Sequence, residues 1–224
     1  MTPANWPCPL PTGGFVQEHA LVADDQRPRR LLIVPALFDE GNKLRRLTVE
    51  TMRRLDAAGV DCFLPDLPGC NESQQPLDRQ TPTIWLGAMA AAARHFRATH
   101  AWGIRGGCLF TPPALPSWHY APVKAASILR QMTRARILAS REAGREENRE
   151  DLAVAARGRG IELAGYPLGA DFYREFEGLA PSAGAVAITQ EQIGGGGLWL
   201  RAEPGEDRDQ ADALAGYLAS GIGG

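Results

Sequence analysis

The chain has 224 residues, of which 44% are hydrophobic and 22% are charged, and its formal net charge is -2 at pH 7. This length and composition are ordinary for one globular α/β domain with room for a small insertion. The slight negative charge argues against nucleic acid as the main partner. The cysteines lack the C-x-x-C spacing of a zinc motif and the pattern of a secreted disulfide framework; they are Cys8, Cys62, Cys70 and Cys108.

The sequence shows neither a signal peptide nor a membrane-spanning segment. Its first residues lack a basic region followed by an apolar run, and no apolar stretch approaches the ~20 residues that cross a bilayer. Free cysteines fit a reducing compartment. We therefore expect a cytoplasmic protein without a membrane span, a metal or a cofactor, whose oligomeric state the sequence does not reveal.

The first half of the chain alternates between expected strands and helices. Residues 1–14 are rich in proline, which predicts an irregular arm, and residues 14–22 have the pattern of an edge strand. Leu31–Val34 and Val60–Leu64 are continuous apolar runs, as expected of strands buried on both faces. Between them, Asn42 is a suitable N-cap for an amphipathic helix that Gly59 ends. A second amphipathic helix over residues 85–96 precedes an expected strand at Ala101–Ile104.

Strands and helices in this order predict a doubly wound parallel sheet with right-handed crossovers. Functional groups of such a sheet gather beyond the carboxyl ends of its strands. The loops after the three buried strands should therefore meet in one crevice. The polar residues that these loops bring there are Glu40, Asn42, Lys43, Asp66 and Arg105.

The second half is less regular. Two helices over residues 123–139 and 141–157 are consistent with a cap inserted over the strand ends. A final helix ends at Gly221. The other expected elements are a strand at 115–120, an extended segment at 161–164, a short helix at 170–179 and two last strands at 185–189 and 198–202.

The stretch His100–Gly107 has the pattern of a strand, a sharp glycine turn and the start of a helix. In an α/β-hydrolase, this is the place of the nucleophile elbow, Gly-x-Ser-x-Gly. The frame here is Gly103-Ile104-Arg105-Gly106-Gly107, with arginine in the serine position. We predict an α/β-hydrolase-like, doubly wound, mostly parallel sheet. Residues 1–224 should form one domain, with a small helical cap insertion at 123–180.

A serine hydrolase of this fold needs serine, acid and histidine in that chain order, with the histidine after the last strand. None of the six serines lies in the elbow frame, and no histidine follows His119. Cys108 is expected to pack as a small apolar residue, and Cys70, in a loop, has no evident histidine partner. Conventional serine esterase activity is therefore not expected.

Arg105 has two possible roles. Its guanidinium stays protonated, so it is no base, but it can bind a carboxylate or phosphate through two parallel hydrogen bonds. Alternatively, it pairs with Glu40 or Asp66 and only braces the loops. The other candidates can also have purely structural roles. Glu40, Asn42 and Lys43 can serve helix capping, and Asp66 can organise a turn.

Several motifs together resemble the α/β-hydrolase-like proteins that accompany the exosortase A protein-sorting and exopolysaccharide system of Gram-negative bacteria, in particular exosortase A system-associated hydrolase 2. The resemblance covers about residues 14–204 and implies an arginine at the elbow as a family trait. This chain departs from the pattern by shorter segments around 110–116 and 180–197. The motifs are Phe38-Asp39-Glu40-Gly41-Asn42-Lys43 with Arg45-Arg46, Leu64-Pro65-Asp66-Leu67-Pro68-Gly69-Cys70, Trp102-Gly103-Ile104-Arg105 and Glu162-Leu163-Ala164-Gly165-Tyr166.

The first expectation for function is a protein without the serine nucleophile that binds an anionic small molecule, or an acyl or glycan intermediate, through Arg105. Glu40, Asn42, Lys43 and Asp66 are the other candidate ligand-binding residues. A hydrolase or transferase with unrecognised catalytic residues and a purely structural partner in an exopolysaccharide or protein-sorting assembly remain the alternatives.

Overall fold

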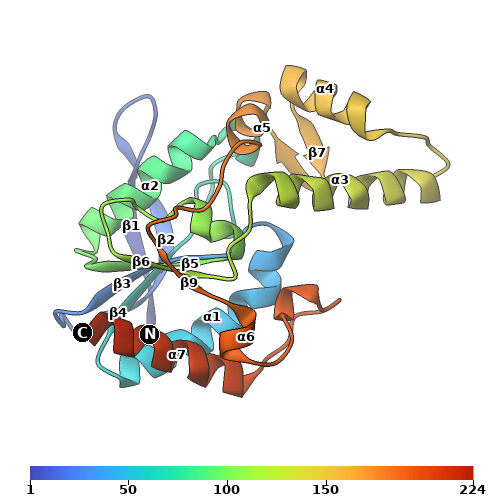
Figure 1. The fold of residues 1–224 in the computed structure, drawn as a ribbon. Helices are drawn as coiled ribbons and strands as arrows, with labels where there is room; N and C mark the ends of the chain where they lie inside the picture. Colours follow the sequence, from blue (N-terminus) through green and yellow to red (C-terminus); the bar gives the residue numbers. More distant parts are fainter. Residues whose placement is uncertain (224) are drawn as a thin grey trace.

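A computed structural model describes residues 1–223 of the chain. In this range, the main sheet has seven strands in the order β1-β2-β4-β3-β5-β6-β9 (Figure 1). Every neighbouring pair from β4 to β9 is parallel, and the pairs β1–β2 and β2–β4 are antiparallel. The strands are β1 (Thr2–Pro9), β2 (Phe15–Ala23), β3 (Arg30–Val34), β4 (Asp61–Pro65), β5 (His100–Ile104), β6 (Ser117–Tyr120) and β9 (Val186–Ile188).

The three apolar runs form neighbouring parallel strands, as predicted. Strand β3 lies between β4 and β5, with Leu32 opposite Phe63 on one side and Ala101 on the other. All five residues of β3 are buried, because helices cover both faces of the sheet. Arg105 follows β5 directly and so lies at the carboxyl edge, also as predicted.

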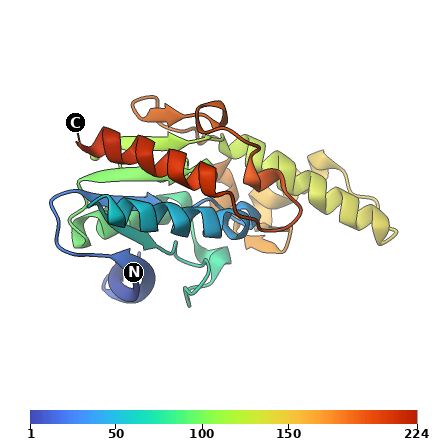
Figure 2. The same cartoon turned by 90° about the horizontal axis from the view of Figure 1, so that it is seen from below.

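Two helices cover one face of the sheet and one covers the other. Helices α1 (Asp39–Ala57) and α7 (Arg208–Gly223) run side by side beneath the sheet (Figure 2). Their apolar residues share a core with Ile33 and Leu64. Helix α2 (Pro82–His95) covers the opposite face, where Trp85 and Phe63 belong to a second core.

The prediction of an irregular arm at the N-terminus was wrong. Residues Thr2–Pro9 form strand β1, which pairs along its whole length with β2. Its prolines are tolerated because β1 is an edge strand, and Trp6 and Cys8 are fully buried. Strand β2 is therefore not the edge strand that its pattern predicted.

The segment between β6 and β9 rises beyond the carboxyl edge of the sheet (Figure 1). We call residues 125–176 of this segment the cap. Its first helix is close to the expected 123–139, whereas the second begins at Arg149 and not at residue 141, because the segment with Gly144 in a left-handed conformation forms a loop and Asn148 caps the helix. The cap contains α3 (Ala125–Glu142), α4 (Arg149–Arg159), the antiparallel pair β7 (Ile161–Leu163) and β8 (Tyr166–Leu168), and α5 (Ala170–Phe176).

The last predicted strand is not a strand. Residues Leu198–Leu200 form a 3-10 turn, η3, after the short helix α6 (Gln190–Ile193). Four glycines at 194–197 precede η3, and a flexible backbone of this kind weakens strand pairing. The final helix continues past Gly221, where the sequence predicted its end. Two further 3-10 turns are η1 (Leu77–Arg79) and η2 (Arg105–Leu109).

Across residues 1–223, none of the helices combines the length and apolar character that a bilayer crossing demands. The longest, α1, has 19 residues and carries charges along much of its length.

Candidate functional site

The turn after β5 has the backbone shape of a nucleophile elbow. Arg105 adopts a φ of 51°, a left-handed conformation that a side chain other than glycine rarely takes. The flanking glycines are required by close approach: a Cβ on Gly107 would lie 2.2 Å from the carbonyl oxygen of Pro35, and one on Gly103 would lie 2.7 Å from Cys108 Cα. The turn therefore aims the side chain of Arg105 above the carboxyl edge, where a serine nucleophile would stand.

Arg105 is held by an ion pair with Glu40. Its Nε donates to Glu40 Oε2 at 3.1 Å and its Nη2 donates to Glu40 Oε1 at 2.9 Å. A third bond runs from Nη1 to the carbonyl oxygen of Ala121 at 3.0 Å. Both charged side chains are largely buried, at 14% and 13% exposure. Of the two roles open for Arg105, these contacts correspond to the brace, and anion binding by Arg105 stays a prediction.

An aromatic ring closes the site from above. The guanidinium carbon of Arg105 lies 4.2 Å from the ring centre of Trp199, on η3, which is within the range of a cation–π contact. The ring of Tyr120 meets Trp199 edge-on, and the Tyr120 hydroxyl donates to Gln190. Burial raises the pKa of Tyr120 to about 12, so this phenol stays protonated. An amide and a tryptophan thus lie close to the elbow, and neither can serve as a catalytic base.

The candidate residues at the start of α1 face different partners. Glu40 turns toward Arg105, whereas Lys43 pairs with Asp39 at 2.8 Å one turn away. Asn42 is not the N-cap: the helix begins at Asp39, and Phe38 holds the N-cap position with a φ of 55° and no capping side chain. Asn42 instead lines a pocket beside the elbow.

Asp66 does not contact Arg105. Its fully buried carboxylate accepts a hydrogen bond from Asn71 Nδ2 at 2.9 Å and lies 3.3 Å from His19 Nδ1. Arg45 approaches the same carboxylate at 3.7 Å. The expected convergence of all five candidates on one point is thus realised only for Arg105 and Glu40, and Asp66 organises the loop after β4.

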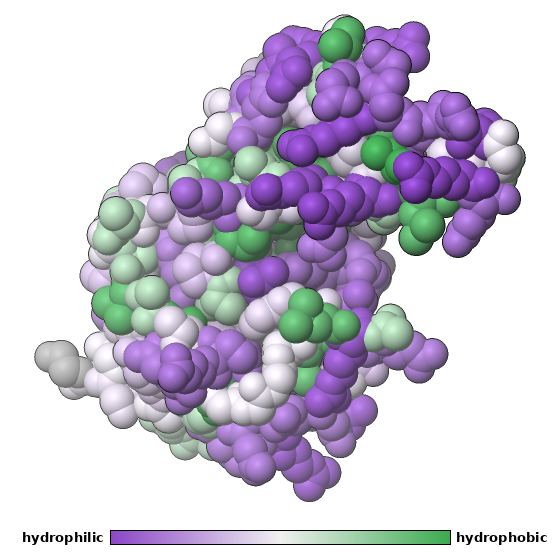
Figure 3. Space-filling model, turned by 45° about the vertical axis from the view of Figure 1, so that its right-hand side comes forward, coloured by the Kyte–Doolittle hydropathy of each residue, from purple (hydrophilic) through white to green (hydrophobic). Residues whose placement is uncertain are grey.

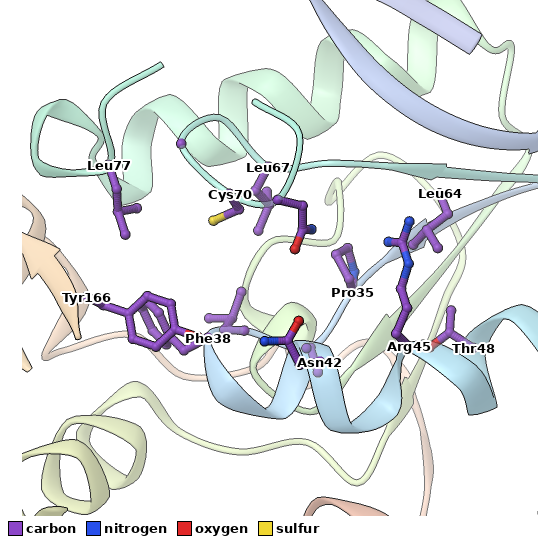
Figure 4. A pocket seen from close by; sticks show the side chains of 15 residues that line it. Pro35, Phe38, Asn42, Arg45, Thr48, Leu64, Leu67, Cys70, Leu77 and Tyr166 are labelled. Carbon is purple, nitrogen blue, oxygen red and sulfur yellow. The ribbon is translucent and has the colours of Figure 1, made fainter. Parts of the chain in front are cut away.

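A pocket of about 120 Å³ opens beside the elbow, between the start of α1, the loop after β4 and the cap hairpin. Figure 4 shows its labelled lining: Asn42 and Arg45 rise from α1, and the apolar side chains of Leu77, Phe38 and Tyr166 gather at the other end. The rest of its wall is made by Pro35, Ala36, Leu37, Gly41, Thr48, Leu64, Leu67, Gly69, Cys70 and Asn71.

The one thiol in this pocket is not activated. Burial, with a smaller effect of the Asp66 and Glu18 carboxylates, raises the pKa of Cys70 to about 12. Because the thiolate is the nucleophilic form, Cys70 is almost entirely the unreactive thiol at neutral pH. Burial likewise raises the pKa of Cys108, behind the elbow.

Within the described part of the chain, no three His, Cys, Asp or Glu side chains gather in an arrangement that could hold a metal ion. The two carboxylates that act on the pocket thiol Cys70, those of Asp66 and Glu18, are already engaged. Glu18 Oε1 accepts from Ser73 Oγ at 2.8 Å and from Gln75 Nε2 at 2.7 Å.

Three residues of this region were not among the candidate site residues that the sequence suggested: Arg45, Asn71 and Trp199. Arg45 lies three residues after Asn42, and residues at that spacing share a helix face, so the helical period could have indicated it. Trp199 follows a glycine run that separates it from any recognisable pattern. Only the path of the chain brings it over Arg105.

No family model matches the chain, and no curated protein sequence matches it. Solved structures do resemble it. The structure of DcsB in complex with its substrate analogue matches with a TM-score of 0.56 at 12% identity, over 100% of both chains. A protein of Agrobacterium vitis S4 that is described as a hydrolase matches with a TM-score of 0.54 at 13% identity, over 99% of this chain and 98% of the other.

A third structure, Est1E from Butyrivibrio proteoclasticus with bound ferulic acid, matches with a TM-score of 0.52 at 13% identity, over 92% of each chain. At these identities the likeness concerns the fold alone. The chain has an α/β-hydrolase-like fold with a mixed, mostly parallel sheet flanked by helices.

Proposed function

We propose that this protein is a non-catalytic member of the α/β-hydrolase fold that binds a small molecule with an apolar body and an anionic end. One observation carries the proposal. The place of the nucleophile is filled by Arg105, which is paired with Glu40 and covered by Trp199, while a pocket opens nearby whose wall includes Pro35 and Leu37, the residues that Gly107 and Gly106 of the elbow approach.

The loss of catalysis follows from the groups around the elbow. Hydrolysis by this fold needs a nucleophile, a base and an acid in mutual reach. A guanidinium and an indole supply neither nucleophile nor base, and the one carboxylate within residues 1–223 that contacts Arg105, that of Glu40, is engaged by it through two hydrogen bonds. The alternative of a hydrolase with unrecognised residues would need another nucleophile in the pocket, and the raised pKa of Cys70 speaks against that thiol.

The ligand chemistry follows from the pocket lining. Most of the wall is apolar, which suits a hydrocarbon or aromatic body. Asn42 and Arg45 lie on the helix side, and the Arg45 guanidinium donates no hydrogen bond within residues 1–223, its closest carboxylate being Asp66 at 3.7 Å. Arg45 thus has donor groups available to an anionic group, such as a carboxylate.

The resemblance to the exosortase A system-associated hydrolase 2 group adds a setting to this proposal. In that setting, the ligand would be an acyl- or glycan-linked intermediate of an exopolysaccharide or protein-sorting system. The support is the joint occurrence of the motifs at 38–43, 64–70, 102–105 and 162–166. Binding studies with such intermediates would test this part separately.

The first experiment concerns activity. Purified protein should neither hydrolyse p-nitrophenyl esters above the rate of buffer nor react with a fluorophosphonate probe. Stoichiometric labelling that disappears when a single serine or cysteine is replaced would overturn the non-catalytic assignment.

The second experiment concerns the ligand. Thermal melts with a panel of aliphatic and aromatic carboxylates, and with the matching alcohols, should show stabilisation by carboxylates. Arg45→Ala should weaken that binding by about 1.5–3 kcal/mol, the range for hydrogen bonds to charged groups. The control is Arg53→Ala, farther along α1, whose side chain is exposed and pairs with Glu50.

Equal weakening by both substitutions would contradict a site at Arg45. If Arg105→Lys weakens binding while Arg45→Ala does not, the ligand lies at the elbow, as the sequence alone predicted. The other candidates, Glu40, Lys43 and Asp66, are engaged with neighbouring side chains, so their substitution is expected to change stability more than affinity.

A further inference from the structure

A second cavity lies in the cap, away from the elbow. It is a groove of about 450 Å³ between α3, α4 and the end of α5. Leu129 and Ala126 of α3 and Ala153 of α4 contribute apolar surface to it, and Val154, at 70% exposure, is a large apolar side chain left open to solvent. The remaining lining residues are Arg130, Thr133, Arg149, Glu150, Arg157, Tyr173 and Glu177.

Three arginines line this groove. Arg130 and Arg149 form no ion pair with any described residue, and both are exposed. Arg157 is paired with Glu177 through bonds of 3.0 and 2.7 Å, and its guanidinium lies 6.0 Å from the Tyr173 ring centre. The guanidinium groups of Arg130 and Arg149 are therefore available to an anion, whereas that of Arg157 is already paired with Glu177.

The charge of this region differs in sign from that of the whole chain. The lining of the groove has three arginines and two glutamates, and residues 123–159, which contain α3 and α4, have nine Lys or Arg and five Asp or Glu, although the chain has a net charge of -2. Figure 3 shows mostly hydrophilic side chains on the cap, with small hydrophobic patches between them. A partner for this face should be acidic and should also carry apolar side chains.

We propose that the groove between α3 and α4 docks an acidic, amphipathic segment of a partner protein, with apolar side chains on Ala126 and Val154 and carboxylates on Arg130 and Arg149. Charge complementarity and the apolar surface between the arginines are the two reasons. This inference concerns a different face from the pocket beside the elbow and does not rest on the proposed function.

The shape and the acids of the groove distinguish this partner from other anions. A flat bilayer surface does not follow a concave groove, whereas a peptide segment does. A nucleic acid backbone would place phosphates against Glu150 and Glu177, and this repulsion is avoided by a peptide that can place a neutral or basic residue there.

The experiment uses the full chain and a fluorescein-labelled amphipathic peptide with glutamates on one helical face and leucines on the other. Anisotropy should show binding, and the same peptide with glutamine in place of glutamate should bind at least about tenfold more weakly. The double variant Arg130→Ala/Arg149→Ala should also lose at least about tenfold. Val154→Asp should weaken binding as well, because it places a like charge in the groove.

The matched control is Arg134→Ala/Arg141→Ala, which removes two exposed arginines of α3 that do not line the groove. It should change affinity by less than about twofold, since distant surface charges are largely screened by salt. Circular dichroism melts should be close to wild type for both double variants, because neither removes an ion pair of the described structure.

Equal losses in the two double variants would overturn the proposal, since they would show attraction to any positive surface. Equal binding of the glutamate and glutamine peptides would overturn it too. The third measurement uses vesicles of phosphatidylcholine and phosphatidylglycerol. If the protein binds these vesicles more tightly than the peptide, and if this binding depends on Arg134 and Arg141, the basic face binds a membrane and the proposal is overturned.

Discussion

Two features of Arg105 are energetically unfavourable: its backbone conformation and the burial of its charge. Its backbone is left-handed, and its charge is largely withdrawn from water. The bidentate pair with Glu40, the carbonyl oxygen of Ala121 and the ring of Trp199 together compensate the charge. Such a pair adds little net stability compared with apolar residues, but losing one partner is expensive because the other charge is left buried.

Arg105→Ala is therefore expected to lower the free energy of unfolding by about 2–3 kcal/mol, somewhat less than for a fully buried pair. The loss leaves the Glu40 carboxylate without its partner. Urea unfolding of the single variant, of Glu40→Ala and of the double variant gives the coupling energy directly.

The double variant should be more stable than the sum of the two single effects predicts. Additive effects would show that the pair does not act as a unit. An unchanged stability of Arg105→Ala, together with a loss of anion affinity, would favour the binding role that the sequence left open.

His119 should make stability depend on pH. Its ring is buried, with Nε2 2.8 Å from Thr111 Oγ1, and burial lowers its pKa below the ordinary 6.5. As pH falls below 6.5, the unfolded chain takes up a proton that the folded protein refuses, so the free energy of unfolding should fall until the folded pKa is reached. Burial lowers the pKa of His100 in the same direction.

Urea unfolding between about pH 7 and pH 5 measures this effect, above the range in which most carboxylates titrate. His119→Gln should flatten the dependence, and His95→Gln, whose ring is exposed to solvent, should leave it as in wild type. A dependence unchanged by His119→Gln would show that other groups cause it.

At the scale of elements, the elbow turn after β5 packs closely against the end of β3, and glycines allow this approach because they have no side chain. Gly107 sits against the carbonyl oxygens of Pro35 and Val34, where a Cβ would lie 2.2 and 2.4 Å away. The same closeness places the end of β5 beside the loop that carries Glu40. The ion pair of Arg105 therefore depends on a glycine that has no side chain and whose carbonyl oxygen accepts a hydrogen bond from the backbone N–H of Phe110 at 3.0 Å.

Gly107→Ala should cost about 3 kcal/mol or more, because backbone atoms must move to relieve the clash. Gly87→Ala is the matched control: this glycine lies within α2, and a Cβ there would meet nothing within 4 Å. It should stabilise the protein by about 0.5–1 kcal/mol through the helix propensity of alanine. Thermal and urea unfolding measure both. Similar effects of the two substitutions would contradict the close packing of the elbow.

At the scale of the whole molecule, stability is expected to be uneven. The sheet is sandwiched between two cores, and β3, β4 and β5 are almost completely buried. The far half of α3 and much of α4 project from the body (Figure 1), and Leu138 and Val154 remain exposed there. Regions with few buried contacts open locally without unfolding the rest.

Native-state hydrogen exchange should distinguish the stable sheet from the less stable cap. Amides of β3, β4 and β5 should exchange only through global unfolding, with free energies that fall as urea is added. Amides at residues 134–142 should exchange through local opening that depends little on urea. Equal exchange free energies in the cap and the sheet would show that the cap unfolds only with the body.

Local patterns in the sequence were enough to predict three buried strands and the elbow turn. Continuous apolar runs identified β3, β4 and β5 because a strand buried on both faces needs apolar side chains throughout, and Gly103 and Gly107 identified the elbow because only glycine fits there. The parallel order of these strands and the position of Arg105 at the carboxyl edge were confirmed. The helical period also indicated α3 and α4, although α4 begins eight residues after its expected start at 141.

Only the tertiary structure decided the contacts between distant segments. The prolines of residues 1–9 predicted an arm, but pairing with β2 and the burial of Trp6 stabilise a strand there. Asp66 was expected near Arg105, yet His19 and Asn71 hold it elsewhere. Trp199 covers Arg105 although 94 positions separate them in the numbering. Such pairings depend on chain path and long-range packing, which no local pattern of residues encodes.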